Sequence, residues 1–162
     1  MITDKRTFAY TKRYKPMDIL PAPPFHLADA IKAIAVALGA IGLATLLQQL
    51  PLNRRHAHAV IVTVAAGSYL NGGMGIWEFP FAMLVAGCAY RGLNSYQFIG
   101  IAWLLHTGWD IVHHFTGHPM ISWLPTSSAE CAITDAILAV WFFVEAPASW
   151  NSIGNKRVPF RS

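Results

Sequence analysis

The segment from Tyr96 to His118 limits most strongly what this chain can form. It begins as an unbroken apolar helix sequence and then acquires five ionisable side chains, His106, Asp110, His113, His114 and His118. At about 100° per residue, the first four fall within an arc of roughly 100° on one helix face. Ionisable groups are costly inside a bilayer and usually face the interior of a helix bundle. We therefore expect a membrane helix whose polar face points into a functional site.

The composition favours a multi-pass membrane protein. Of the 162 residues, 54% are hydrophobic and only 12% are charged, whereas soluble domains usually carry about 25% charged residues. Apolar segments separated by short polar connections cover residues 27–50, 56–70, 76–93, 96–118 and 128–146. We therefore predict an all-α fold, an integral membrane bundle of about five transmembrane helices.

The polar ends of the chain divide it into three regions. Residues 1–26 are predicted to be a basic tail at the membrane surface, residues 27–147 the transmembrane bundle, and residues 148–162 a basic C-terminal tail. The net charge of +4 is concentrated in these tails, which favours contact with anionic lipid headgroups. No nucleic-acid motif is present, so we expect no nucleic-acid partner. Residues 1–26 contain no apolar core of the signal-peptide type, so we expect no cleavage.

The basic residues of the connections bear on orientation. The connections after the first and third segments carry Arg54, Arg55 and Arg91, and the C-terminal tail is also basic, whereas the other two connections have no Lys or Arg. This distribution predicts a cytoplasmic C-terminus. The five basic residues of the N-terminal tail oppose that orientation in a chain of five spans.

Four side chains form the predicted acid/base set: Glu78, His106, Asp110 and Asp135. Asp110 lies one turn after His106, so it can fix the tautomer of that imidazole. A carboxyl group in apolar surroundings keeps its proton and can deliver it to an alkene or epoxide. The alternative is a set of polar groups that joins helices through hydrogen bonds.

Two tryptophans each precede one of these acids, in Trp77-Glu78 and Trp109-Asp110. Tryptophan faces can stabilise a cationic intermediate. Neighbouring residues of a helix point about 100° apart, however, so the alternative is an accidental pairing.

A metal site is a further possibility, with zinc, iron or copper suited to imidazole and carboxylate ligands. His106 and His113 lie about 10 Å apart along a helix axis, so one helix does not supply a closed ligand set. The predicted ligands are His106, Asp110, His113, His114 and Glu130. Glu130 also fits a helix cap with Ser127.

Other polar residues are interpreted as structural. His56, His58 and His118 are expected near a membrane interface, and Tyr69, Asn71 and Arg91 in turns or at an interface. Cys88 and Cys131 both lie in apolar segments, so no disulfide is expected.

The residues from Asn71 to Phe142 carry a resemblance. The stretches NGGMGIWEFPFA, YRGLNSY, WLLHTGWDIVHH and SSAECAITDA resemble a family of small multi-pass bacterial membrane proteins of unassigned function. The resemblance implies no activity. It does imply a location in the bacterial inner membrane.

Two fragments resemble characterised classes. The sequence from Asp110 to His114 is similar to one histidine box of membrane di-iron hydroxylases and desaturases, with Asp110 where the first histidine would be. His106 and Asp110, together with Glu78, are similar to the acid and histidine set of sterol-isomerase-like proteins or integral-membrane terpene cyclases.

Three functions are therefore compatible with the sequence. The first is a membrane-embedded enzyme that acts on a lipophilic small molecule by acid/base or metal-assisted chemistry. The second is a proton- or metal-coupled carrier or channel. The third is a structural or haem-binding subunit of a membrane complex. Each is compatible with a homo-oligomer or a larger assembly.

Overall fold

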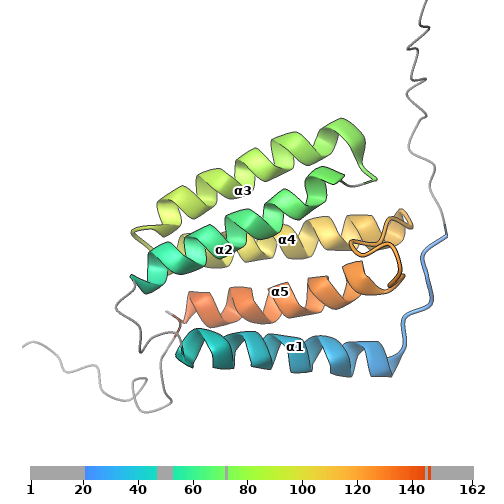
Figure 1. Cartoon of the computed structure of the whole chain (residues 1–162), viewed down its shortest axis with the longest axis horizontal. Helices are drawn as coiled ribbons and strands as arrows, with labels where there is room; N and C mark the ends of the chain where they lie inside the picture. The colour runs from blue at the N-terminus through green and yellow to red at the C-terminus, as the bar shows by residue number, and fades with distance from the viewer. Residues whose placement is uncertain (1–20, 47–52, 72, 145, 147–162) are drawn as a thin grey trace, which may run out of the picture.

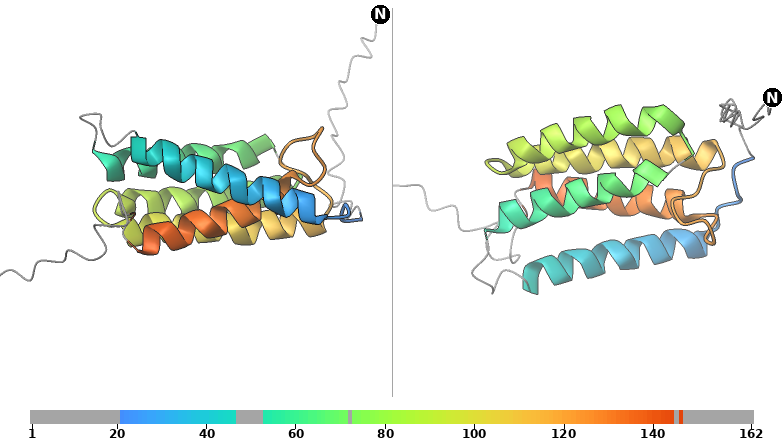
Figure 2. Two further views of the ribbon diagram at one scale, coloured as in Figure 1. Left: turned by 90° about the horizontal axis from the view of Figure 1, so that it is seen from below. Right: turned by 45° about the horizontal axis from the view of Figure 1, so that its top comes forward.

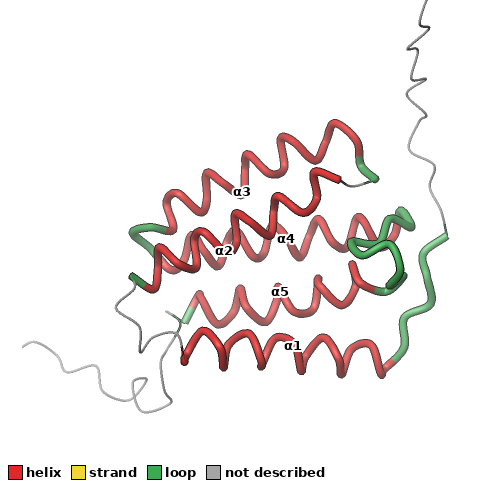
Figure 3. The backbone as a smooth tube through the Cα atoms, viewed as in Figure 1, coloured by secondary structure: helices red, strands yellow, loops and turns green. Residues whose placement is uncertain are grey.

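The computed structural model describes residues 21–46, 53–71, 73–144 and 146. They form five α-helices: α1 (Leu27–Leu46), α2 (Arg54–Ser68), α3 (Glu78–Gly92), α4 (Tyr96–Phe115) and α5 (Ser127–Phe143). The helices lie roughly side by side along the long axis of the molecule (Figure 1). The described residues contain no named strand, only helices, turns and loops (Figure 3). The predicted all-α class is confirmed.

Helix α4 lies in the middle of the bundle. It contacts α5, α3 and α2, whereas α1 lies at one edge and packs against α5 (Figure 2). The α4 and α5 backbones approach closely at Gly100, where a Cβ atom would lie 3.1 Å from the carbonyl oxygen of Ala139. The central position of α4 brings its polar face into contact with three other helices.

Local sequence sets the helix ends. The Asn53 side chain caps α2 by accepting hydrogen bonds from the backbone N–H groups of Arg55 and His56. Pro80 is the third residue of α3, where its missing N–H costs no helical hydrogen bond. The 3₁₀ turn η2 (Tyr69–Asn71) extends α2, and η3 (Gly75–Trp77) leads into α3.

The bundle combines buried ionisable side chains with exposed apolar ones. Its interior contains buried ionisable side chains: His58, Glu78, His106, Asp110, His113 and Asp135. All five helices expose large apolar side chains, among them Leu38, Val64, Phe79, Leu104 and Val140. Soluble proteins rarely bury unpaired charges or expose extended apolar surface.

One described helix is a candidate membrane span by length and composition. That helix is α1, which buries only Ala33, Ala37 and Ala44. Helix α4 has the same length of 20 residues but carries the buried polar groups, and the other helices are shorter. The predicted tails lie largely outside the described residues, which include only 21–26 of the first.

Candidate functional site

The first half of the site is an inner cluster built on α4. The hydroxyl of Tyr69 donates a hydrogen bond of 2.7 Å to Oδ1 of Asp110. The hydroxyl oxygen of Tyr69 also lies 3.1 Å from Nδ1 of His106. The exposed fractions of His106 and Asp110 are 1% and 0%, so this cluster is closed off from the outside.

Helix α5 adds a second carboxyl group to the inner cluster. Asp135 lies beside Asp110, and its Oδ2 lies 4.0 Å from Nδ1 of His106. Two carboxylate charges side by side in a buried site would repel each other strongly, so the pair holds a proton between them. On the far side of the ring, Nε2 of His106 lies 3.2 Å from the carbonyl oxygen of Val62.

These contacts accommodate two proton arrangements, both electrically neutral. In the first, Asp110 donates to the Tyr69 oxygen, and the Tyr69 hydroxyl donates to Nδ1 of His106. In the second, the Tyr69 hydroxyl donates to the Asp110 carboxylate, and Nδ1 of His106 carries the proton. In both, Asp135 keeps its proton beside Asp110, and Nε2 of His106 donates to Val62. The two differ by one proton moved from Asp110 to His106 through the hydroxyl of Tyr69.

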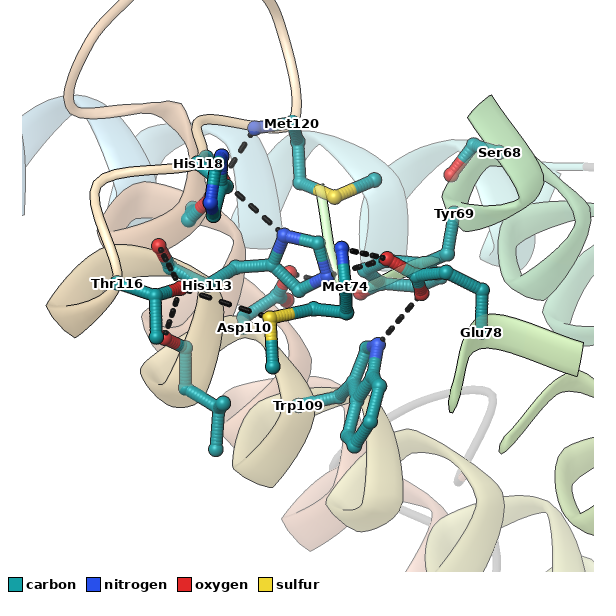
Figure 4. Close-up of polar contacts among 12 residues, drawn as sticks. Ser68, Tyr69, Met74, Glu78, Trp109, Asp110, His113, Thr116, His118 and Met120 are labelled. Carbon is teal, nitrogen blue, oxygen red and sulfur yellow. Dashed lines mark hydrogen bonds and ion pairs between the residues drawn. The ribbon is translucent and has the colours of Figure 1, made fainter. Parts of the chain in front are cut away.

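The second half of the site is an outer cluster centred on Glu78, the first residue of α3 (Figure 4). Trp109 donates a hydrogen bond of 2.8 Å to Oε2, and the backbone N–H of Met74 donates one of 3.1 Å to Oε1. Nε2 of His113 lies 3.1 Å from Oε1. A carboxylate that accepts two hydrogen bonds and lies within ion-pair distance of His113, at the positive end of a helix dipole, is stabilised in its charged form.

The end of α4 orients His113. Gly117 adopts a left-handed conformation with φ 71°, and the N–H of His118 bonds to the carbonyl of His113 at 2.9 Å. This turn places the carbonyl of His118 3.1 Å from Nδ1 of His113. The two ring nitrogens of His113 therefore lie 3.1 Å from Oε1 of Glu78 and 3.1 Å from the carbonyl oxygen of His118.

One known protein family matches most of this chain. A family described as a family of unknown function (DUF6010) matches residues 28–148. The chain belongs to the DUF6010 family. The match includes α2 to α5, nearly all of α1 and every member of both clusters, and it confirms the predicted resemblance to a family of unknown function. Searches of curated proteins and of solved structures gave no match.

The DUF6010 bundle buries all four residues of the predicted acid/base set and brings three of them together. His106, Asp110 and Asp135 lie in the inner cluster, and Glu78 lies in the outer cluster. His113, predicted as a metal ligand, pairs with Glu78.

The other two predicted metal ligands lie elsewhere. His114 contacts Phe25 edge to face at the surface of α4. Glu130 pairs with Lys32 at 3.0 Å and accepts a hydrogen bond of 2.8 Å from Thr126. Within the described ranges, no three His, Cys, Asp or Glu side chains are grouped so that they could hold a metal ion.

Three residues have roles that the sequence interpretation missed. Tyr69, assigned to turn or interface chemistry, joins the inner cluster because η2 turns its ring into the bundle. Trp109 bonds to Glu78 on another helix and stacks on Phe81 with ring centroids 4.7 Å apart. His58, expected at an interface, is buried against Trp141 and Phe142. No sequence pattern distinguishes these contacts in advance.

Two apolar grooves lie on the outside of the helices. The first has a volume of about 410 Å³ and is lined by Phe25, Thr107, Ile111, His114, Phe115, Ala129, Ala132, Ile133 and Ala136. The second has a volume of about 310 Å³ and is lined by Met83, Leu84, Gly87, Cys88, Arg91 and Phe98. Neither groove is lined by a member of the inner or outer cluster.

Proposed function

We propose that this chain is an integral membrane protein of five transmembrane helices that binds and relays protons through its core. One observation carries the proposal: the bundle is apolar outside, while its paired acids and imidazoles are inside. In a bilayer, the apolar outer side chains would contact lipid, and the acids and imidazoles would be shielded from lipid inside the protein. The same surface in water would expose apolar side chains on every helix.

The helix lengths support the membrane assignment. The 20 residues of α1 and α4 correspond to about 30 Å. Including the 3₁₀ turns, α2 and α3 reach about 28 Å, and α5 reaches about 26 Å. The hydrocarbon core of a bilayer is about 30 Å thick.

The distribution of charges along the bundle supports an orientation. Arg54 and Arg55 begin α2, and Arg91 lies near the end of α3, at the same end of the molecule. Arg54 donates a hydrogen bond of 2.7 Å to the carbonyl of Ala146, just beyond α5. By the positive-inside rule, we assign this end and the C-terminus to the cytoplasm of a bacterial inner membrane.

The arrangement of the clusters supports proton movement better than chemistry on a bound molecule. Glu78 and His113 lie near one end of the bundle, and the inner cluster follows along α4. On α2, His58 lies one turn before Val62, whose carbonyl faces His106. Ionisable groups therefore recur along the bundle axis, whereas neither groove reaches the acids.

Proton flux into liposomes containing the purified full-length chain tests this proposal. Wild-type protein should dissipate an imposed pH gradient, and Tyr69→Phe should abolish the flux because it removes the hydroxyl between Asp110 and His106. Tyr90→Phe is the matched control, because Tyr90 is 75% exposed and belongs to neither cluster. Equal flux in wild-type and Tyr69→Phe liposomes, or none above empty liposomes, would contradict the proposal.

An enzyme acting on a lipophilic substrate is the second candidate. Its support is the larger groove, whose size suits a small ligand and whose lining includes His114, the neighbour of His113. A substrate in this groove would contact His114 and none of the buried acids. Loss of turnover of a membrane lipid on His114→Phe, with proton flux retained, would favour the enzyme.

A further inference from the structure

We propose that the second groove, between the outer faces of α3 and α4, binds an anionic phospholipid. In this arrangement the lipid phosphate pairs with Arg91, and one acyl chain lies along the apolar lining. The inference rests on the proposed membrane location, because it places this groove against the bilayer. It adds a binding site separate from both polar clusters.

The groove has the shape of a channel for an alkyl chain. Successive turns of α3 provide one wall, from Met83 to Arg91, a distance of about 12 Å along the helix axis. Phe98 of α4 faces this wall. Gly87 forms part of the floor, and a Cβ atom there would meet nothing within 4 Å. A larger side chain at position 87 would therefore occupy the space that we assign to the acyl chain.

Arg91 provides the charge at one end of the groove. Its guanidinium carbon lies 5.4 Å from the centre of the Phe98 ring. None of the ion pairs found within the described part of the chain involves Arg91. A guanidinium group binds phosphate oxygens in a bidentate manner, so it suits a phospholipid headgroup.

The position of Arg91 in the bundle matches the position of anionic headgroups. It lies in the last turn of α3, at the end that we assign to the cytoplasm. Basic pockets between membrane helices on the cytoplasmic side are suited to anionic headgroups, and each basic residue contributes about fivefold in affinity. A zwitterionic headgroup carries no net negative charge, so it should bind Arg91 more weakly than an anionic headgroup. Inorganic phosphate could pair with Arg91 but would leave the apolar lining of the groove empty.

Native mass spectrometry of the full-length protein can test this site. The protein would be released from vesicles of equal parts phosphatidylglycerol and phosphatidylcholine with identical acyl chains. Wild-type protein should retain phosphatidylglycerol preferentially. Arg91→Gln should reduce the preference about fivefold, and Gly87→Leu should reduce the retention of both lipids.

Two controls match these variants. Gly67→Leu also fills open space beside a helical glycine, but Gly67 lines neither groove. Lys32→Gln removes a basic side chain from the opposite end of the bundle, where Lys32 pairs with Glu130. Both controls should keep the wild-type preference.

The outcomes separate this inference from the proposed function. The lipid site is overturned if wild-type protein shows no preference, if Arg91→Gln keeps it, or if Gly87→Leu retains both lipids at the wild-type level. Loss of the preference in excess inorganic phosphate would reassign Arg91 to a soluble anion and also overturn it. Release of the protein from membranes by alkaline carbonate would instead refute the membrane location itself.

Discussion

Tyr69 and Asp110 are joined by a hydrogen bond of 2.7 Å that connects the turn after α2 to the second half of α4. The Tyr69 hydroxyl also faces His106, so it stands between a carboxyl group and an imidazole. A hydroxyl group accepts one proton and donates another without moving its oxygen. In the proposed function, this contact is the step at which the inner cluster transfers a proton.

The two carboxyl groups of the inner cluster should differ in their effect on proton flux. Asp110→Asn should abolish the flux, because an amide at this position has no proton to release toward Tyr69. Asp135→Asn should retain measurable flux, because an amide beside Asp110 is as neutral as the protonated carboxyl group that it replaces. Both variants should unfold within about 1 kcal/mol of wild type, since an amide preserves shape and hydrogen bonding. Liposome flux and unfolding in mixed micelles provide the measurements. Retained flux in Asp110→Asn would exclude this relay.

The buried pair of Glu78 and His113 should contribute far more to stability than the pair of Glu130 and Lys32. Glu78→Gln removes the charge of one partner of a buried pair and should cost about 3–5 kcal/mol. Glu130→Gln removes a partly exposed pair and should cost at most about 1 kcal/mol. Unfolding of both variants in the same micelles gives the comparison. Similar losses would mean that Glu78 and His113 do not form an ion pair.

Alanine at Gly73 and alanine at Gly67 should change the stability of the fold in opposite directions. A Cβ atom on Gly73 would overlap the ring of His118. Gly73→Ala should therefore shift the His118 carbonyl away from His113 and destabilise the fold by about 1–3 kcal/mol. Gly67 lies in α2 with open space beside it, so Gly67→Ala should stabilise the fold by up to about 1 kcal/mol. Thermal unfolding measures both effects. Equal shifts of the melting temperature in the two variants would contradict the close approach of Gly73 to His118.

A lysine on the outer surface should test what surrounds the bundle. Val64 is 69% exposed and lies within α2. In a bilayer, Val64→Lys should cost about 2.5–3.5 kcal/mol and reduce the fraction of integrated protein. Ser68→Lys, at the end of the same helix, should be tolerated. Carbonate extraction measures integration; undiminished integration of Val64→Lys would argue against lipid at this face.

Helical periodicity predicted the polar face of α4 correctly. His106, Asp110 and His113 share one side of the helix, and all three are buried. His114 lies at the edge of the same arc and faces the larger groove, because it points about 80° away from His106. Spacing along one helix therefore identified the buried side of α4, but it did not show that His114, at the edge of that side, lies outside the cluster.

The partners of this face depend on tertiary packing, which one-dimensional spacing does not contain. Tyr69 enters the cluster because a 3₁₀ turn follows α2, and the turn sequence alone does not specify where its ring points. Trp109 precedes Asp110 in sequence but bonds to Glu78, since neighbouring residues of a helix point in different directions. Glu130, predicted as a tentative metal ligand, pairs with Lys32 of α1 instead.

The position of the proton on His106 is decisive for proton transfer through Tyr69. The measurement is the ¹⁵N NMR spectrum of histidine-labelled protein in liposomes, with His106→Gln used for assignment. We expect Nδ1 of His106 to exchange between a protonated and an unprotonated form at constant pH. We also expect Asp110→Asn to leave only the unprotonated form. A wild-type Nδ1 held in one form, and unchanged by Asp110→Asn, would contradict proton transfer through Tyr69.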